Sequence, residues 1–210
     1  MFIEVQSGET GLLDSNQILK GDFMENRHAS IAGRLKLKKL NQVGLVVNDI
    51  EATARHYMTH FGIGPWYRPK MPEVQKAIFR GREIDLVIDI VLAYCGPVQI
   101  ELIKTKGKDK NSYAELLERH GEGIHHVGFE VYGIKKKLAL LKEMGIQPLQ
   151  STILKTGGGT VVTAVYLDTA ATGGMIIELI ETKKFGVPLK MWPCMMKVGC
   201  VMGDAYKLKL

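Results

Sequence analysis

The stretch Leu40–Val47 (LNQVGLVV) decides the fold, because a similar stretch recurs later in the chain as Ile124–Val131 (IHHVGFEV). The tetrapeptide Ile100–Ile103 (IELI) also reappears, identically, as Ile177–Ile180. Similar segments that return in the same order indicate a duplicated structural unit. The sequence therefore predicts two copies of one module, about residues 39–105 and 122–182, within a domain of residues 39–182.

Each copy has the order strand, helix, strand, strand, strand. Apolar residues at helical spacing predict helices at 49–61 and 133–144, which end at Gly62 and Gly145. Segments rich in Val and Ile, bounded by Gly and Pro, indicate strands. The predicted strands are 40–47, 74–80, 84–95 and 97–104 in the first copy, and 123–131, 147–154, 161–168 and 174–181 in the second.

A short helix at 112–120 is predicted between the copies, with Ser112 and Glu115 at capping-box spacing. The expected fold is α+β, built from paired βαβββ modules. Two four-stranded sheets, each with its helix packed outside, should form a half-barrel cavity around the site. Residues 1–38 and 183–210 are interpreted as N-terminal and C-terminal extensions of open function.

Composition and charge exclude several classes of protein. The chain has 210 residues, 46% of them hydrophobic and 24% charged, which is ordinary for a soluble globular protein. The net charge of +6 comes without a basic cluster interleaved with aromatic residues, so no nucleic-acid partner is expected. No apolar stretch approaches the ~20 residues of a membrane span. Three cysteines without a CxxC pair, and no recognisable signal peptide, predict a cytoplasmic protein.

Two glutamates lie in the middle of apolar strands. Glu101 and Glu178 each interrupt an Ile-Glu-Leu-Ile run, and strand alternation turns each away from its apolar neighbours. An ionised carboxylate in a buried strand is costly unless it is paired, protonated or bound to a cation. Because both copies carry the same feature, these glutamates are candidate metal ligands rather than solvent-facing residues.

Gln42 and His126 occupy equivalent places in the first strand of each copy. A lone strand histidine is more often a structural residue, but the match to Gln42 and to the two glutamates makes His126 a candidate ligand. By strand alternation His125 should point the other way, which makes it the structural member of the pair.

Five segments together resemble the vicinal-oxygen-chelate superfamily, the group of glyoxalases, bleomycin-resistance proteins and dioxygenases. They are Gln42–Val47 with Asp49–Ile50, Gly62–Trp66, Ile100–Ile103, Gly121–Val131 and Gly174–Glu178. The resemblance covers roughly residues 39–182. It implies paired βαβββ modules with one metal ligand on the first and last strand of each, which places Gln42, Glu101, His126 and Glu178 around one divalent ion. An amide, an imidazole and two carboxylates suit Mn, Co, Ni, Mg or Zn.

Two activities within this superfamily fit the chain. Glu101 to Val131 looks most like methylmalonyl-CoA epimerase, whereas the order Gln, Glu, His, Glu is that of eukaryotic-type glyoxalase I. In either case the metal stabilises an enediolate while a glutamate removes the proton α to a carbonyl or thioester. The base is Glu178 or Glu101. Gln42 argues against a ferrous dioxygenase, which needs two histidines. A non-catalytic drug-binding protein is the alternative of another class, and a homodimer is expected from similar proteins.

Overall fold

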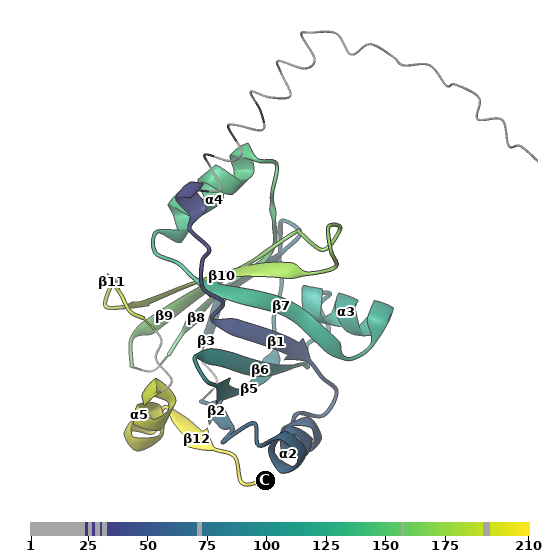
Figure 1. Cartoon of the computed structure of the whole chain (residues 1–210), viewed down its shortest axis with the longest axis vertical. Helices are drawn as coiled ribbons and strands as arrows, with labels where there is room; N and C mark the ends of the chain where they lie inside the picture. Colours follow the sequence, from purple (N-terminus) through teal and green to yellow (C-terminus); the bar gives the residue numbers. More distant parts are fainter. Residues whose placement is uncertain are drawn as a thin grey trace, which may run out of the picture. The chain divides into compact units, whose positions relative to one another are not determined.

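The computed structural model describes residues 24, 27, 30, 33–70, 73–156, 158–190 and 194–210. Residues 37–210 form one compact unit, and residues 1–36 are a separate unit. Among the described residues, no helix combines the length and apolarity that crossing a membrane requires. The predicted strands and helices of both modules are present within a few residues of their expected bounds (Figure 1).

Among the described residues, the first module contains one helix and six strands. They are β1 (Gln42–Val46), α2 (Ile50–Phe61), β2 (Tyr67–Pro69), β3 (Glu73–Phe79), β4 (Arg82–Glu83), β5 (Ile88–Cys95) and β6 (Val98–Thr105). Helix α2 begins at Asp49, whose side chain accepts a hydrogen bond from the Ala52 N–H, and ends at Gly62, which has a φ of 66°. Both caps satisfy backbone groups that a helix end leaves unpaired. The β2 strand was not predicted.

Helix α3 and the second module follow. They are α3 (Ser112–His120), β7 (Gly123–Glu130), α4 (Ile134–Glu143), β8 (Pro148–Lys155), β9 (Thr160–Leu167) and β10 (Ile176–Lys184). The predicted capping box of α3 is wrong. The N-cap is Asn111, whose side chain accepts from the Tyr113 and Ala114 N–H groups, while Glu115 pairs with Arg80 instead.

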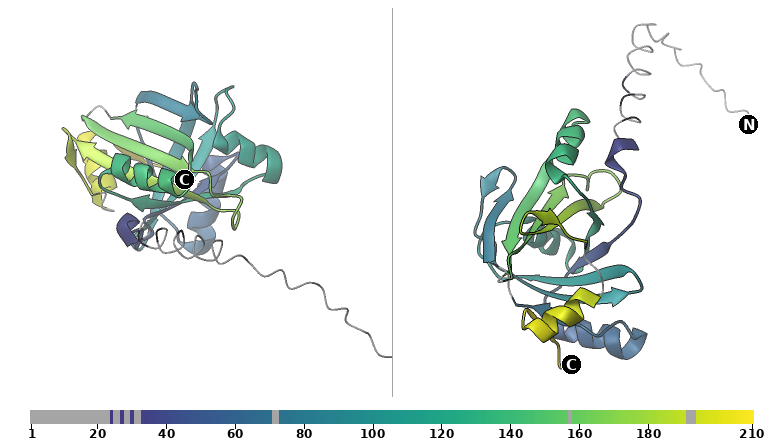
Figure 2. Two further views of the ribbon diagram at one scale, coloured as in Figure 1. Left: turned by 90° about the horizontal axis from the view of Figure 1, so that it is seen from above. Right: turned by 90° about the vertical axis from the view of Figure 1, so that its left-hand side faces the viewer.

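The described residues form one mixed twelve-stranded sheet, not the two separate four-stranded sheets that the repeat predicts. Its order is β12-β2-β5-β6-β1-β7-β10-β9-β8-β3-β4, with β11 paired to β10. The first strands of the two modules, β1 and β7, pair antiparallel and so join the two halves. The sheet curls into a half-barrel, as expected for this fold class (Figure 2).

The β3–β4 hairpin leaves its own module. Strand β3 pairs antiparallel with β8 of the second module, from Glu73↔Lys155 to Phe79↔Gln150. The prediction of 74–80 as a strand is therefore confirmed, but its expected place beside the first module's own strands is wrong. Its inward side chains Ala77 and Phe79 are buried with residues of both modules, so burial of apolar surface stabilises the crossing.

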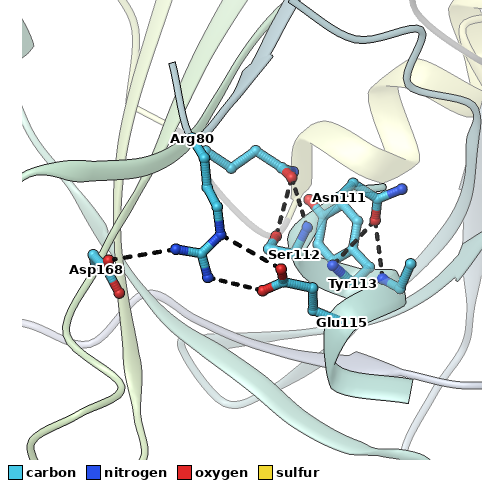
Figure 3. Close-up of polar contacts among 8 residues, drawn as sticks. Arg80, Asn111, Ser112, Tyr113, Glu115 and Asp168 are labelled. Carbon is cyan, nitrogen blue, oxygen red and sulfur yellow. Dashed lines mark hydrogen bonds and ion pairs between the residues drawn. The ribbon is translucent and has the colours of Figure 1, made fainter. Parts of the chain in front are cut away.

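Polar contacts fix this crossing and helix α3 in place (Figure 3). Arg80, which follows β3, makes ion pairs of 3.0 Å with Glu115 of α3 and 3.9 Å with Asp168. Gln150 of β8 is 1% exposed, and its Oε1 accepts from both the backbone N–H and the hydroxyl of Ser112. The start of α3 is thus tied to the second module, which positions the tyrosine that follows, Tyr113.

The C-terminal extension packs on the domain. Its elements are β11 (Val187–Pro188), α5 (Cys194–Met202) and β12 (Ala205–Lys207). Strand β12 pairs with β2 and adds an edge strand to the sheet, and α5 lies beside it (Figure 1). The C-terminal extension therefore adds an edge strand and a helix to the domain.

Two apolar clusters lie on opposite faces of the first module's strands. Helix α2 covers the outer face, where Ile50, Ala54 and Trp66 pack against Leu102. The inner cluster fills the α3 end of the half-barrel and includes Ile103, Tyr113 and Tyr166 together with the β3 residues. The remaining interior is left as a cavity between β5–β6 and β8–β10.

Candidate metal centre

Three of the four candidate ligands line this cavity of about 360 Å³. They are Gln42 on β1, Glu101 on β6 and Glu178 on β10, and each is less than a tenth exposed. The fourth, His126 on β7, is fully buried beside them. Central strands of the sheet therefore bring the sequence-predicted residues together on its inner face.

The polar atoms of this group lie close to one another. The Nε2 atom of His126 is 3.1 Å from Oε2 of Glu178 and 3.7 Å from Oε2 of Glu101. Neither His126 Nε2 nor Glu178 Oε2 has a hydrogen-bond partner of good geometry among the described residues. Buried polar groups in native proteins are nearly always hydrogen-bonded, and this ion pair alone leaves both atoms able to accept a further partner.

Two glycines make room for these side chains. A Cβ atom on Gly44 would lie 1.9 Å from Cε1 of His126. A Cβ on Gly128 would lie 2.9 Å from Oε2 of Glu178 and 3.0 Å from the Cβ of Gln42. The glycines two residues after Gln42 and His126 thus make room for ligands on the neighbouring strands.

The prediction that His125 points away from His126 is wrong. Strand β7 has a register shift opposite Gly44 and Leu45, a bulge that interrupts strand alternation. As a result the rings of both histidines contact Tyr166, and the two Nδ1 atoms are 3.1 Å apart. His125 is 2% exposed and also contacts the Tyr113 ring.

Burial and neighbouring charge shift the proton affinities of the site. Burial, and to a smaller extent Glu178, raise the pKa of Glu101 to about 7 even though His126 opposes this. Burial lowers the pKa of His126, but Glu178 and Glu101 outweigh it and the net shift is upward. Burial, together with the charge of His126, lowers the pKa of His125 to about 3, so this ring stays neutral.

Two tyrosines that sequence reasoning missed stand beside the carboxylates. Tyr113 of α3 and Tyr166 of β9 line the cavity, and the Tyr113 hydroxyl donates to the Tyr166 hydroxyl at 2.8 Å. Burial raises the pKa of both phenols well above 10, so both stay protonated. Strand alternation could have pointed to Tyr166. It lies directly opposite Glu178 in the β9–β10 pair, so both side chains point to the same face of the sheet. Tyr113 has no such signal, because only tertiary packing brings α3 to the site.

The donor set fits a divalent ion in part. Neighbouring ligands about 2.1 Å from a metal lie about 3 Å apart in an octahedral site, close to the 3.1 Å between His126 and Glu178. Glu101 lies farther from the imidazole. Among the described residues, no three His, Cys, Asp or Glu side chains form a ready-made metal cluster. The observation in favour of a metal is that His126 Nε2 and Glu178 Oε2 lie about as far apart as two neighbouring metal ligands. The Glu101 carboxylate and the Gln42 amide line the same cavity.

The fold and the site together define a protein of two βαβββ modules with a polar centre between them. Residues 41–166 match the Glyoxalase/Bleomycin resistance protein/Dioxygenase superfamily, and the chain belongs to this family. It is 26% identical to human mitochondrial methylmalonyl-CoA epimerase over 143 residues, which are 68% of this chain and 73% of the human protein. It is also 22% identical to the uncharacterized protein YqjC of Bacillus subtilis over 147 residues, 70% of this chain and 94% of YqjC.

Solved structures agree with this fold. A hypothetical protein from Bacillus halodurans C-125 superposes with a TM-score of 0.51 at 21% identity, covering 70% of this chain and 95% of that one. A Streptomyces coelicolor methylmalonyl-CoA epimerase variant in complex with 2-nitronate-propionyl-CoA gives a TM-score of 0.50 at 18% identity, covering 74% of this chain and all of that one. At these identities the likeness establishes the fold.

Proposed function

We propose that this chain is a divalent-metal-dependent enzyme that abstracts a proton α to a carbonyl and passes through an enediolate, most like methylmalonyl-CoA epimerase. The observation that carries the proposal is the buried pair of His126 Nε2 and Glu178 Oε2, 3.1 Å apart, unsatisfied and beside Glu101 in a cavity. Similarity to a human epimerase, and the fold shared with epimerases, support the reaction class.

The proposed ligands are Gln42, Glu101, His126 and Glu178. A divalent ion held there would polarise a substrate carbonyl and stabilise the negative charge that develops when the adjacent C–H bond is broken. The protein's own groups then hold the carbonyl near two carboxylates in a cavity that excludes much of the water. Such a setting strengthens electrostatic interactions with the developing charge.

One of the two glutamates accepts the proton. Glu101 and Glu178 both face the cavity, and general-base catalysis needs a carboxylate within hydrogen-bond reach of the proton. Because the Tyr113 hydroxyl donates to that of Tyr166, the Tyr166 hydroxyl proton is the one that can donate a hydrogen bond to a substrate oxygen. Glu178 or Glu101 remains the base, and its twin or a bound water returns a proton to the α-carbon.

Solvent-deuterium exchange tests the proposal. We expect the Mn²⁺-loaded protein to exchange the α-proton of methylmalonyl-CoA, followed by proton NMR, and Glu178→Gln to abolish the exchange. The matched control is Glu181→Gln, the same change on the same strand, because Glu181 accepts from the Gly133 and Ile134 N–H groups and does not line the cavity. This control should keep both metal and exchange.

The alternatives give different outcomes in the same assay. Exchange only into the glutathione–methylglyoxal adduct would identify a glyoxalase I-type lyase, for which Gln42 at the first ligand position is the supporting feature. A protein without stoichiometric divalent metal, with no exchange into either compound and no effect of Glu178→Gln, would be a binding protein, and the proposal would be lost.

A further inference from the structure

The cavity continues well beyond the candidate ligands. On strand β10 the residues that follow Glu178 on the same face, Ile180, Thr182 and Lys184, all line it. A strand rises about 3.3 Å per residue, so this wall extends about 20 Å from Glu178 to Lys184. The paired residues of β9, Ala164, Val162 and Thr160, line the cavity along the same length.

Among the described residues, the cavity meets packed apolar side chains at its α3 end. Beyond Glu178 toward α3, the apolar cluster that includes Phe79, Ile103 and Ile176 fills the interior. In the other direction the wall reaches α5, where Met196, Val198 and Met202 line the cavity. A ligand that extends from the polar centre must therefore run toward α5.

Much of the wall in this direction is aliphatic, and charged side chains (Lys70, Glu130, Lys184 and Asp204) also line it. Its apolar members include Leu92, Leu154, Val162 and Ile180. The threonines 152 and 182 contribute hydroxyls. At about 30 Å³ for a group the size of a water molecule, 360 Å³ accommodates roughly a dozen non-hydrogen atoms. That space exceeds what a reacting carbonyl and its α-carbon occupy.

The end wall includes helix α5 of the C-terminal extension. The family match covers residues 41–166, and α5 lies outside it. Val198 and Met202 are 52% and 64% exposed although they line the cavity, so they stand at its opening. A feature that the extension adds to the substrate cavity is suited to determine which substrate enters.

We propose that the substrate is an elongated amphipathic carbonyl compound. Its carbonyl lies between Glu101 and Glu178, and its aliphatic chain runs between β5 and β10 to end against Val198 and Met202 of α5. The place of the carbonyl rests on the proposed function. The place of the chain rests on the cavity alone, so the two can fail separately.

Calorimetric titration with a neutral homologous series tests the chain site. The probes are 1-hydroxybutan-2-one, 1-hydroxyhexan-2-one and 1-hydroxydecan-2-one, measured with Mn²⁺ and again with a chelator. Each fully buried methylene should tighten binding by about fourfold, so the six methylenes added across the series should give a gain of about a thousandfold or more. The gain should persist with the chelator, because it does not depend on the metal.

Two variants of α5 identify the place of the chain. Val198→Asp puts a charge into the cavity wall, whereas the matched control Val201→Asp puts the same charge on a residue that is 90% exposed and does not line the cavity. We expect Val198→Asp to weaken the decanone about tenfold and Val201→Asp to change it less than about twofold. Both should leave the butanone unchanged.

The outcomes separate the two proposals. A gain below about tenfold across the series, or equal losses in the two variants, would overturn the chain site. If the series tightens and only Val198→Asp weakens it, while the Mn²⁺-loaded protein exchanges the α-proton of none of the probes, of methylmalonyl-CoA or of the glutathione–methylglyoxal adduct, the chain site stands and the proposed enolisation fails.

Discussion

Replacing Gly44 by Ala tests whether the sheet itself sets the position of His126. The added Cβ would lie 1.9 Å from Cε1 of His126. Carbon atoms in contact keep about 3.5 Å, so the ring or strand β1 must move by about 1.6 Å. His126 is fully buried and its ring meets those of His125 and Tyr166, which leaves little room for that movement.

The expected magnitude follows from this overpacking. We expect Gly44→Ala to lower the free energy of unfolding by about 1–3 kcal/mol, measured by urea unfolding. The displaced ring should also weaken Mn²⁺ binding by at least about tenfold in calorimetry, the lower end of what loss of ligand orientation costs. Gly123→Ala is the matched control, because a Cβ on this β7 residue meets nothing within 4 Å.

A second variant keeps the test informative if Gly44→Ala does not fold. A Cβ on Gly128 would meet Oε2 of Glu178 at 2.9 Å, and a carboxylate end can rotate away. Gly128→Ala should therefore cost less stability and still weaken Mn²⁺ binding. If both variants keep Mn²⁺ affinity within about twofold of the wild type, the reasoning that places the metal between these strands is refuted.

Three further predictions concern the same interior. In metal-free protein, the pKa of Glu101 is about 7 folded against about 4.5 unfolded, so its contribution to stability is present below pH 4.5 and is lost as pH rises through 7. The wild type should lose roughly 3 kcal/mol relative to Glu101→Gln over that window in urea unfolding; parallel pH curves would contradict this. Thr182→Val removes a buried hydroxyl that has no hydrogen-bond partner among the described residues, so it should raise the free energy of unfolding by about 1 kcal/mol. A loss of stability would show that the hydroxyl has a hydrogen-bond partner after all. Gln150→Leu should lower the free energy of unfolding by about 2 kcal/mol, because it leaves the buried N–H and hydroxyl of Ser112 unpaired. Arg80→Ala should lower it by less than about 1 kcal/mol, because the Arg80 side chain is half exposed. Chemical unfolding that ranks the two variants in reverse would contradict the burial argument.

The sequence predicted the repeated elements well because each has a local signal. Helix α2 shows apolar spacing, an acidic N-cap and a left-handed glycine at its end, and the strands show Val and Ile runs. Strand β3 also has its own pattern, but nothing local says which strand it pairs with. Its pairing with β8 depends on burying Ala77 and Phe79 against the other module.

The site residues were predicted by alternation, and alternation failed where the strand is irregular. It correctly placed Gln42, Glu101 and Glu178 on the cavity wall and His126 beside them. It misplaced His125, because a bulge adds a residue to β7 without a clear sequence mark. The expected homodimer, the cytoplasmic location and the metal itself stay predictions.

The internal repeat explains more of the site than its ligand positions. Because β1 and β7 pair antiparallel, Gln42 lies opposite Gly128 and His126 lies opposite Gly44. The first strand of each copy therefore supplies one ligand and, two residues later, the glycine that gives the other copy's ligand its space. A glycine weakens a strand, so its presence at both equivalent positions indicates close approach of another group. Reading the two copies as facing each other, rather than as separate modules, would have predicted from the sequence alone that both strands meet at one centre.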